Sequence, residues 1–241
     1  MNLDFDIDEH RNYYDAYWTG HKQRLNFHEI IRLSEILRAI VKVIETTGNK
    51  PLRICDLGCG RGWLANELTK FGSVVAVDLS ATGVALANER WPHIDFRVAD
   101  ITNWRPDEQF DLVVSSEVLE HVPDQTGFAS TVGHLLRDGG HLVLTTPNRN
   151  VKSAWDRGNQ GHQLVEKWLT PRELRRLLAD AEGILHKTFI FDFGYTGLLR
   201  VTSAPKLLRL LDGTGTRPLY DVIRNAMGMG LYQIFLGRYS A

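Results

Sequence analysis

Cysteine is scarce in this 241-residue chain, where only Cys55 and Cys59 occur, four positions apart. Such a pair cannot make the disulfide framework of a small secreted domain, so we expect a reducing, cytoplasmic environment. Two thiols are also too few for a structural zinc site built on thiolates. Long apolar runs are missing as well, because none approaches the roughly 20 residues that span a bilayer. The sequence therefore predicts no membrane segment.

Repeats and low-complexity tracts are also missing, and no Lys or Arg stands among the first ten residues, where a secretory signal would need one. A hydrophobic content of 43% and a charged content of 24% are ordinary for a globular protein, so we expect one domain over 1–241. Charge is uneven. Residues 1–140 carry 14 basic and 21 acidic side chains (net −7), whereas 141–241 carry 14 and 8 (net +6). The basic excess suits either a solvated surface or an anionic partner.

The first 50 residues form a leading segment. Four aromatic residues gather at positions 13–18, and apolar residues then recur at helical spacing over 25–45 until Gly48 and Pro51. Two interpretations of the aromatic cluster stay open. The helix could pack on the core, or the segment 1–50 could form a helical lid over a ligand.

Strand and helix patterns alternate after Pro51. Strands are expected at 52–56, 74–78, 95–99, 110–115, 141–145, 184–193 and 231–236, and helices at 63–71, 80–90, 126–136 and 171–181. Two further helical patches, at 205–211 and 220–227, fall within 194–230. This alternation predicts an α/β fold with a mostly parallel sheet and helices on both faces.

A glycine-rich turn follows the first strand, with the form Asp-x-Gly-x-Gly-x-Gly over 56–62. A strand, a tight turn and a helix N-terminus together make a nucleotide-sized pocket. The third glycine comes one residue too early for the G-x-G-x-x-G of dinucleotide enzymes, and Trp63 stands in its place. A phosphate-cradling loop that ends in Lys and Ser or Thr is also absent.

Five motifs in order make the chain resemble the class I S-adenosylmethionine (SAM)-dependent methyltransferases, most closely the ubiquinone-pathway O-methyltransferase branch. They are DLGCGRG at 56–62, VAVDLS at 75–80, ADI at 99–101, FDLVVSSEVLEHV at 110–122 and LRDGGHLVL at 136–144. The resemblance implies a Rossmann-like sheet of seven strands, with the last one antiparallel. It divides the chain into a cofactor-binding core at 51–193, a helical insertion over the substrate site at 194–230 and a last strand at 231–241.

The resemblance also implies that SAM is the cofactor and identifies its contacts. The first motif would wrap the methionine part, the acid of the second would hold the ribose hydroxyls, and the acid of the third would bind the adenine amine. The expected cofactor-binding residues are Asp56, Gly58, Gly60, Gly62, Asp78, Leu79, Asp100, Ile101, Ser116 and Glu117.

Elementary chemistry agrees with this assignment. Glycines without a Cβ atom let a backbone approach a ligand closely. Asp78 ends a strand and can accept two hydrogen bonds from a vicinal diol, and Asp100 can accept one from an exocyclic amine. Each acid could instead cap the following helix, which is the ordinary role of a carboxylate at a strand end.

The fourth motif carries Glu117, Glu120 and His121 at spacing i, i+3 and i+4, so in a helix they would share one face. Carboxylates and an imidazole can ligate a divalent ion, and the resemblance extends to ubiquinone-pathway and small-RNA 3′-end methyltransferases that bind one there. The same string also resembles relatives that use no metal. We expect no metal ligands.

Two histidines are candidate general bases for an oxygen nucleophile, His121 and His162, the latter in a polar stretch after the fifth strand. His162 could equally be a surface residue. No Asn-Pro-Pro-Tyr motif follows the fourth strand, which counts against amino methylation of nucleobases.

The sequence thus predicts an enzyme that methylates an oxygen of a small molecule, anionic or carrier-bound. No basic, aromatic-rich appended domain is visible, so nucleic acid is disfavoured as a partner. The alternatives are a small-molecule N-methyltransferase, a metal-dependent RNA 3′-terminal 2′-O-methyltransferase, and a non-catalytic SAM-binding module. A homodimer is left open.

Overall fold

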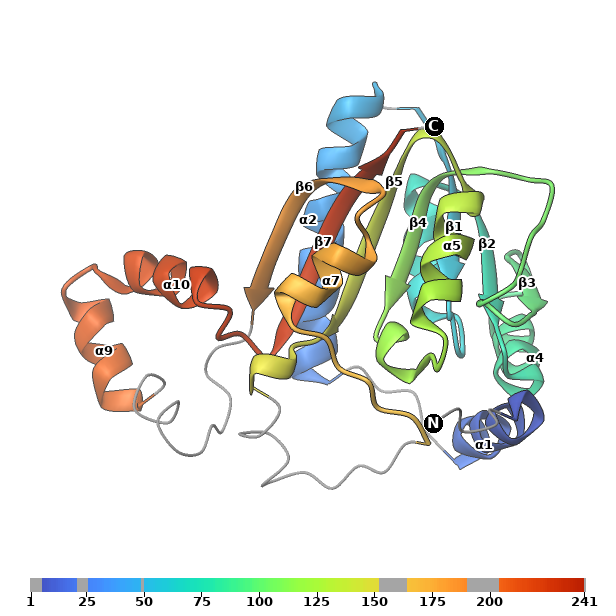
Figure 1. The fold of residues 1–241 in the computed structure, drawn as a ribbon, viewed down its shortest axis with the longest axis horizontal. Coiled ribbons are helices and arrows are strands. Elements are labelled where there is room, and N and C mark those ends of the chain that lie inside the picture. Colours follow the sequence, from blue (N-terminus) through green and yellow to red (C-terminus); the bar gives the residue numbers. More distant parts are fainter. Residues whose placement is uncertain (1–5, 21–25, 49, 152–163, 190–203, 241) are drawn as a thin grey trace.

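The computed structural model describes residues 6–20, 26–48, 50–151, 164–189 and 204–240. Seven strands form one sheet in the order β3-β2-β1-β4-β5-β7-β6 (Figure 1). Only β7 runs antiparallel to its neighbours, so the predicted Rossmann-like topology is confirmed. The strands are β1 (Leu52–Leu57), β2 (Gly72–Asp78), β3 (Asp95–Val98), β4 (Phe110–Ser116), β5 (Leu136–Pro147), β6 (Ala181–Phe189) and β7 (Tyr232–Tyr239).

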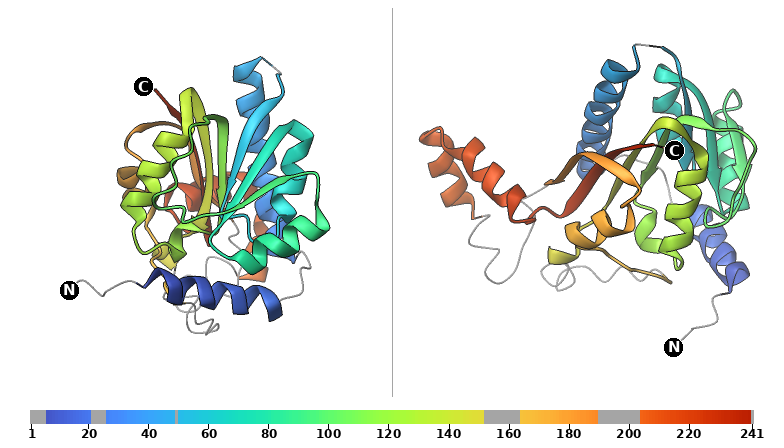
Figure 2. Two further views of the ribbon diagram at one scale, coloured as in Figure 1. Left: turned by 90° about the vertical axis from the view of Figure 1, so that its right-hand side faces the viewer. Right: turned by 45° about the horizontal axis from the view of Figure 1, so that its top comes forward.

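Helices cover both faces of this sheet (Figures 1 and 2). One apolar cluster joins the sheet to α2, α3 and α4, and a second joins its other face to α5 and α7. The helices are α1 (Ile7–Gly20), α2 (Phe27–Thr47), α3 (Trp63–Leu68), α4 (Ala81–Arg90), α5 (Gln125–Leu135), α7 (Pro171–Leu177), α9 (Pro205–Gly213) and α10 (Arg217–Ala226). Short 3₁₀ turns are η1 (Thr69–Phe71), η2 (Leu119–His121) and η3 (Arg149–Val151).

The central strands read as continuous apolar runs because both of their faces are covered. In β1, Ile54 packs into one cluster and Cys55 and Leu57 pack into the other. Burial on both faces leaves the strand ends as the place for polar side chains. Asp56, next to the end of β1, is 1% exposed.

Several predicted boundaries are wrong, and two of them extend a helix too far. The helix expected over 126–136 stops at Leu135, and β5 begins at Leu136, five residues before the expected start. Gly139 breaks the pattern with a left-handed φ of 72° inside the early part of β5, where the register against β4 shifts. A glycine that we interpreted as a helix breaker therefore marks an irregularity in a strand.

The helix expected over 171–181 also ends early, at Leu177. Its start is as predicted, because Thr170 and Glu173 form a capping box. Residues from Ala181 onward instead pair with β7, in a ladder that begins at Tyr239. Strand pairing at the sheet edge overrides the local helical pattern.

The leading segment contains two helices. In α2, Asn26 and Glu29 form a capping box and Gly48 ends the helix in the left-handed region, which confirms the helix expected near 25–45. The aromatic cluster lies on a separate helix, α1, which runs beneath the carboxyl ends of the strands (Figure 1).

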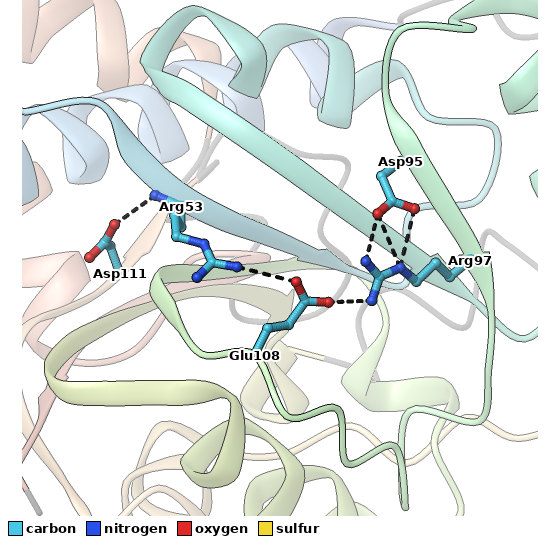
Figure 3. A network of polar contacts seen from close by, with 5 residues as sticks. All are labelled: Arg53, Asp95, Arg97, Glu108 and Asp111. Carbon is cyan, nitrogen blue, oxygen red and sulfur yellow. Dashed lines mark hydrogen bonds and ion pairs between the residues drawn. The ribbon is translucent and has the colours of Figure 1, made fainter.

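The opposite ends of β1, β3 and β4 meet in a polar network (Figure 3). Arg53 and Arg97 both contact Glu108, Arg97 also pairs with Asp95 at 2.6 Å, and the Arg53 amide donates to Asp111 at 2.6 Å. These are partly exposed ion pairs, which contribute little stability individually.

The helical patches expected within 194–230 appear as α9 and α10, which project beyond β6 at the edge of the sheet (Figures 1 and 2). Residues 194–203 lie outside the described part of the chain. Among the described helices, none combines the length and the apolar character needed to cross a bilayer.

Candidate active site

The glycine turn after β1 uses three left-handed residues. Gly58, Gly60 and Gly62 have φ values of 89°, 51° and 76°, a region that side chains with a Cβ atom disfavour. The amides of Gly58 and Cys59 donate to the Val77 carbonyl at 2.7 and 2.9 Å. These bonds hold the turn against the end of β2.

The turn is also tightly enclosed. A Cβ atom on Gly58 would lie 2.3 Å from a methyl carbon of Val118, and one on Gly60 would lie 2.5 Å from the Trp18 ring. Two segments distant in sequence, the β4 loop and α1, therefore close on the turn.

Asp78 ends β2 and is bound to this turn. Its Oδ2 accepts the Gly60 amide at 2.7 Å, and its Oδ1 accepts the Ser80 amide at 2.9 Å. Burial raises the pKa of Asp78, and the two amide hydrogen bonds oppose the rise. The carboxylate lines a cavity together with Leu79.

Asp100 and Ile101 line the same cavity at the end of β3. Both carboxylate oxygens of Asp100 already accept local hydrogen bonds, from the Thr102 amide at 2.9 Å and from Asn103 Nδ2 at 3.1 Å. These bonds close a turn and cap no helix, because none lies between β3 and β4, and contact with an adenine amine stays a prediction.

This first cavity has a volume of about 670 Å³ and lies between the strand ends and α1. A second cavity, of about 810 Å³, adjoins it below the glycine turn and α2. Residues that line both cavities mark where they meet, and these are Tyr14, Trp18, Gly58, Glu117 and His121.

Asp56 lines the second cavity. Its Oδ2 has no hydrogen-bond partner among the described residues, although the oxygen is buried. Burial and the nearby Asp78 charge raise the pKa of Asp56 to about 7. An orphaned buried oxygen beside a cavity is suited to a cationic ligand group.

Arg32 is a site residue that the sequence analysis missed. It extends from α2 into the second cavity, 3.2 Å from Oε2 of Glu117, and its guanidinium lies 5.3 Å from the Tyr232 ring. In the sequence, Arg32 is simply one of the polar residues between the apolar positions of α2. Its side chain is only 12% exposed, which no local sequence signal reveals.

Glu117 is the one described non-glycine residue with a positive φ, 58°. Its Oε1 is buried without a hydrogen-bond partner among the described residues. Burial raises the pKa of Glu117 to about 8, against the lowering effect of Arg32. Its neighbour Ser116 lines the same cavity and exchanges a 2.9 Å hydrogen bond with Thr145.

Glu120 and His121 lie in the 3₁₀ turn η2, so the α-helical face expected for 117–121 does not form. Glu120 accepts from Thr146 at 2.9 Å and lies 3.6 Å from Nε2 of His121. Within the described ranges, no three His, Cys, Asp or Glu side chains converge as metal ligands. Glu117 pairs with the Arg32 guanidinium instead, and the absence of metal ligands stays a prediction.

His121 stands where the two cavities meet, with Nδ1 3.0 Å from the Val165 carbonyl. Because a carbonyl only accepts, Nδ1 carries the proton and Nε2 keeps its lone pair. Burial lowers the pKa of His121. The other candidate base, His162, lies outside the described residues.

Helix α1 supplies four of the residues that line the first cavity, Ile7, His10, Tyr14 and Trp18. Asp15 fixes this helix, because its Oδ1 accepts from the Ser80 hydroxyl and, at 2.9 Å, from the Thr82 amide. The aromatic cluster therefore lies over the cavity. Sequence spacing could not distinguish this position from ordinary core packing.

Comparisons with known proteins agree with this geometry. Residues 22–183 match the family model described as a methyltransferase domain. A ubiquinone biosynthesis O-methyltransferase of a Bradyrhizobium species is 33% identical over 189 residues, which cover 69% of this chain and 74% of that protein. One from Rhodopseudomonas palustris is 33% identical over 165 residues, covering 64% and 65%.

A crystal structure of magnesium protoporphyrin IX methyltransferase from Synechocystis with bound SAM shares the fold. It has a TM-score of 0.62 at 15% identity over the full length of both chains. The chain therefore belongs to the SAM-dependent methyltransferases. It is an enzyme that uses SAM, as the motifs predicted, and its curated relatives support transfer to an oxygen of a small molecule.

Proposed function

We propose that this enzyme methylates a hydroxyl oxygen of a small aromatic molecule, with His121 as the general base. The observation that carries this proposal is that His121 lines both cavities. The ring is neutral near pH 7 because burial lowers its pKa. A neutral imidazole with a free lone pair can accept a hydroxyl proton.

The first cavity would hold the adenosine part of SAM. Asp78 would accept from the ribose hydroxyls and Asp100 from the adenine amine, between the apolar side chains of Leu79 and Ile101. The left-handed Gly58 and the cavity-lining positions of both acids support this arrangement.

The second cavity would hold the methionine part. The orphaned oxygen of Asp56 would accept from the ammonium, and Arg32 would pair with the carboxylate. A zwitterion fits a cavity that presents both carboxylates and a guanidinium. Ser116 and Glu117 would line the passage to the sulfur.

When bound, SAM supplies a methyl group on a sulfonium that an in-line nucleophile displaces. In that reaction, His121 would accept the proton of the acceptor hydroxyl at Nε2. Glu120, whose Oε1 lies 3.6 Å from Nε2 of His121, would stabilise the imidazolium when the Glu120 carboxyl group is ionised. His121 then returns the proton to water.

We propose that α1 is a lid over the adenosine cavity. Asp15 links it to the first turn of α4, and Trp18 packs on Gly60 and Gly83. Movement of α1 would open the cavity and let the product cofactor leave. We also propose that the segment 194–230 covers the substrate site. The described residues of α9 and α10 do not line either of the two cavities.

An aromatic acceptor is proposed because the curated relatives are named for ubiquinone biosynthesis and because aromatic side chains of α1 border the site. The net charge of +6 over 141–241 suits an anionic or carrier-bound acceptor. Both cysteines are buried free thiols, which supports a cytoplasmic enzyme.

The test is a methyl-transfer assay on matched acceptors, a catechol and the corresponding aminophenol, with product mapping by mass spectrometry. We expect methylation of oxygen that is unaffected by a chelator. Preferred methylation of nitrogen would instead establish an N-methyltransferase. Chelator-sensitive methylation of an RNA 3′ end would establish the RNA enzyme, and SAM binding without turnover on any acceptor would establish a binding module.

A further inference from the structure

Tyr232 begins β7 and is held by the two strands that flank it. It pairs with Pro147 at the end of β5 and with Phe189 at the end of β6, so its backbone is fixed on both sides. The centroids of the Phe189 and Tyr232 rings lie 5.8 Å apart. Strand pairing and this ring contact therefore limit the positions that are open to the Tyr232 side chain.

The same ring contacts α2 at two points. The Tyr232 hydroxyl lies 3.4 Å from Nδ1 of His28, and the two ring centroids are 5.8 Å apart. The guanidinium carbon of Arg32 lies 5.3 Å from the centroid of the Tyr232 ring. Because His28 and Arg32 are four residues apart, their side chains lie on one face of the helix. Tyr232 thus packs along the face of α2 that carries Arg32.

Arg32 lines the second cavity, whereas Tyr232 is not among the described residues that line either cavity. Nη1 of Arg32 lies 3.2 Å from Oε2 of Glu117. Nε of Arg32 is buried and has no hydrogen-bond partner among the described residues. Glu117 is therefore a charged contact of this guanidinium, and the Tyr232 ring is a neutral one that lies outside the ligand space.

A neutral aromatic face is suited to hold an arginine that still has to bind an anion. Burial raises the pKa of Tyr232, so its phenol is uncharged. The ring quadrupole attracts the cation without neutralising it, whereas a further carboxylate in the same place would repel an incoming carboxylate. A guanidinium that is held in place before the ligand arrives also loses less conformational entropy on binding.

We propose that Tyr232 is a positioning residue for the cofactor, which holds the Arg32 guanidinium where it receives the methionine carboxylate of SAM. This inference rests on the proposed pairing of Arg32 with that carboxylate. A guanidinium binds a carboxylate through the N–H groups at its edge, so a ring packed against its face does not compete with the ligand. Tyr232 therefore raises the affinity for SAM without touching it.

The experiment compares two ligands by calorimetry on the full-length protein. They are S-adenosylhomocysteine and S-adenosyl-3-thiopropylamine, which lacks only the carboxylate. We expect Tyr232→Leu to weaken binding of S-adenosylhomocysteine by about tenfold, because a desolvated cation–π contact is lost, and to leave binding of the analogue unchanged. Tyr232→Phe keeps the ring and should bind both ligands like the wild type.

The matched control is Tyr239→Leu, which removes a tyrosine ring at the other end of β7 and should alter neither affinity. Arg32→Ala should weaken binding of S-adenosylhomocysteine by about 100-fold, and adding Tyr232→Leu to it should have no further effect. Mono-, di- and trifluorinated phenylalanine at position 232 keep the shape of the ring and weaken its π face, so this affinity should fall stepwise. The fluorinated series supplies the readout if Tyr232→Leu does not fold.

Equal loss of affinity for both ligands in Tyr232→Leu would show a merely structural role and overturn the proposal. A loss that persists in the Arg32→Ala background would overturn it too, as would fluorinated variants that all bind like Tyr232→Phe. If Arg32→Ala weakens S-adenosylhomocysteine binding and Tyr232→Leu does not, the positioning role alone fails. If Arg32→Ala binds this ligand like the wild type, the proposed carboxylate pairing fails, and the role of Tyr232 fails with it.

Discussion

The two ends of the central sheet carry acids in opposite states. At the amino ends of the strands, Glu108 and Asp95 are half-exposed or less and both contact arginines (Figure 3). At the carboxyl ends, Asp56 and Glu117 are buried, and each keeps an oxygen without a partner among the described residues.

This difference separates structure from function. Ion pairs between partly exposed side chains lose little hydration on folding, and they contribute little to the stability of the protein. Burial of a carboxylate with an unsatisfied oxygen is destabilising, and the pKa values, raised to about 7 for Asp56 and to about 8 for Glu117 despite its ion pair with Arg32, record that cost. Acids of this kind are expected at binding sites, where a bound ligand supplies the missing hydrogen bond or charge partner.

The largest expected difference is in SAM affinity, between the variants Asp78→Ala and Asp95→Ala. Loss of two hydrogen bonds from a charged acceptor, each worth about 1.5–3 kcal/mol, should weaken SAM binding by about 100-fold or more. Asp95→Ala removes an acid of the Arg97 network and should leave affinity unchanged. Calorimetry on both variants measures the contrast, and equal affinities would contradict it.

Next in size is the effect of His121→Gln on turnover. Removal of a general base should lower kcat by about 100-fold without changing SAM affinity. Raising the pH should partly restore the rate, because the acceptor then ionises without help. The control is His134→Gln, an exposed histidine of α5. A full rate in the His121 variant would show that another group takes the proton.

Asp15→Ala should release α1. Loss of its bonds to Ser80 and to the Thr82 amide should speed release of S-adenosylhomocysteine by about tenfold. Stopped-flow fluorescence of Trp18 can follow this release. Asp8→Ala, an exposed acid of the same helix, should leave the rate unaltered, and identical rates in both variants would remove the case for a lid.

A smaller, pH-dependent effect follows from Asp56. Its folded pKa of about 7 exceeds the ordinary value of 3.8, so the unligated enzyme loses stability as the pH rises from 3.8 to about 7. The ionised carboxylate can pair with the ammonium, so SAM affinity should rise over the same range. Calorimetry across this range should show a flat profile for Asp56→Asn, and a parallel rise in the variant would assign the effect to Glu117 or Glu120.

The smallest effect is expected for Glu108→Gln. Its ion pairs with Arg53 and Arg97 are partly exposed, so unfolding should be easier by about 1 kcal/mol or less. SAM affinity should be unchanged. Chemical denaturation measures the first quantity, and a loss of several kcal/mol would mean that this end of the sheet is more than a surface network.

Much of the fold was predictable because strands buried on both faces leave unmistakable apolar runs. The glycine turn was predictable too, since three left-handed positions leave glycine as the residue of choice. The failures at Leu135 and Leu177 lie where long-range strand pairing decided the boundary. Such pairing leaves no local pattern in either segment.

The residues of the site fall into the same two groups, those that the sequence predicts and those that it does not. Residues at strand ends, such as Asp78, are placed by the topology of a parallel sheet. Arg32 and Trp18 reach the cavities from helices whose docking depends on tertiary contacts.

The most direct test of this account is calorimetric titration of the wild-type enzyme with SAM in parallel with Asp78→Ala. The account predicts a single site in the wild type and loss of about 100-fold or more in the variant. Absence of binding to the wild type, or equal affinity of both proteins, would contradict the claim that the carboxyl ends of β1 and β2 hold the cofactor.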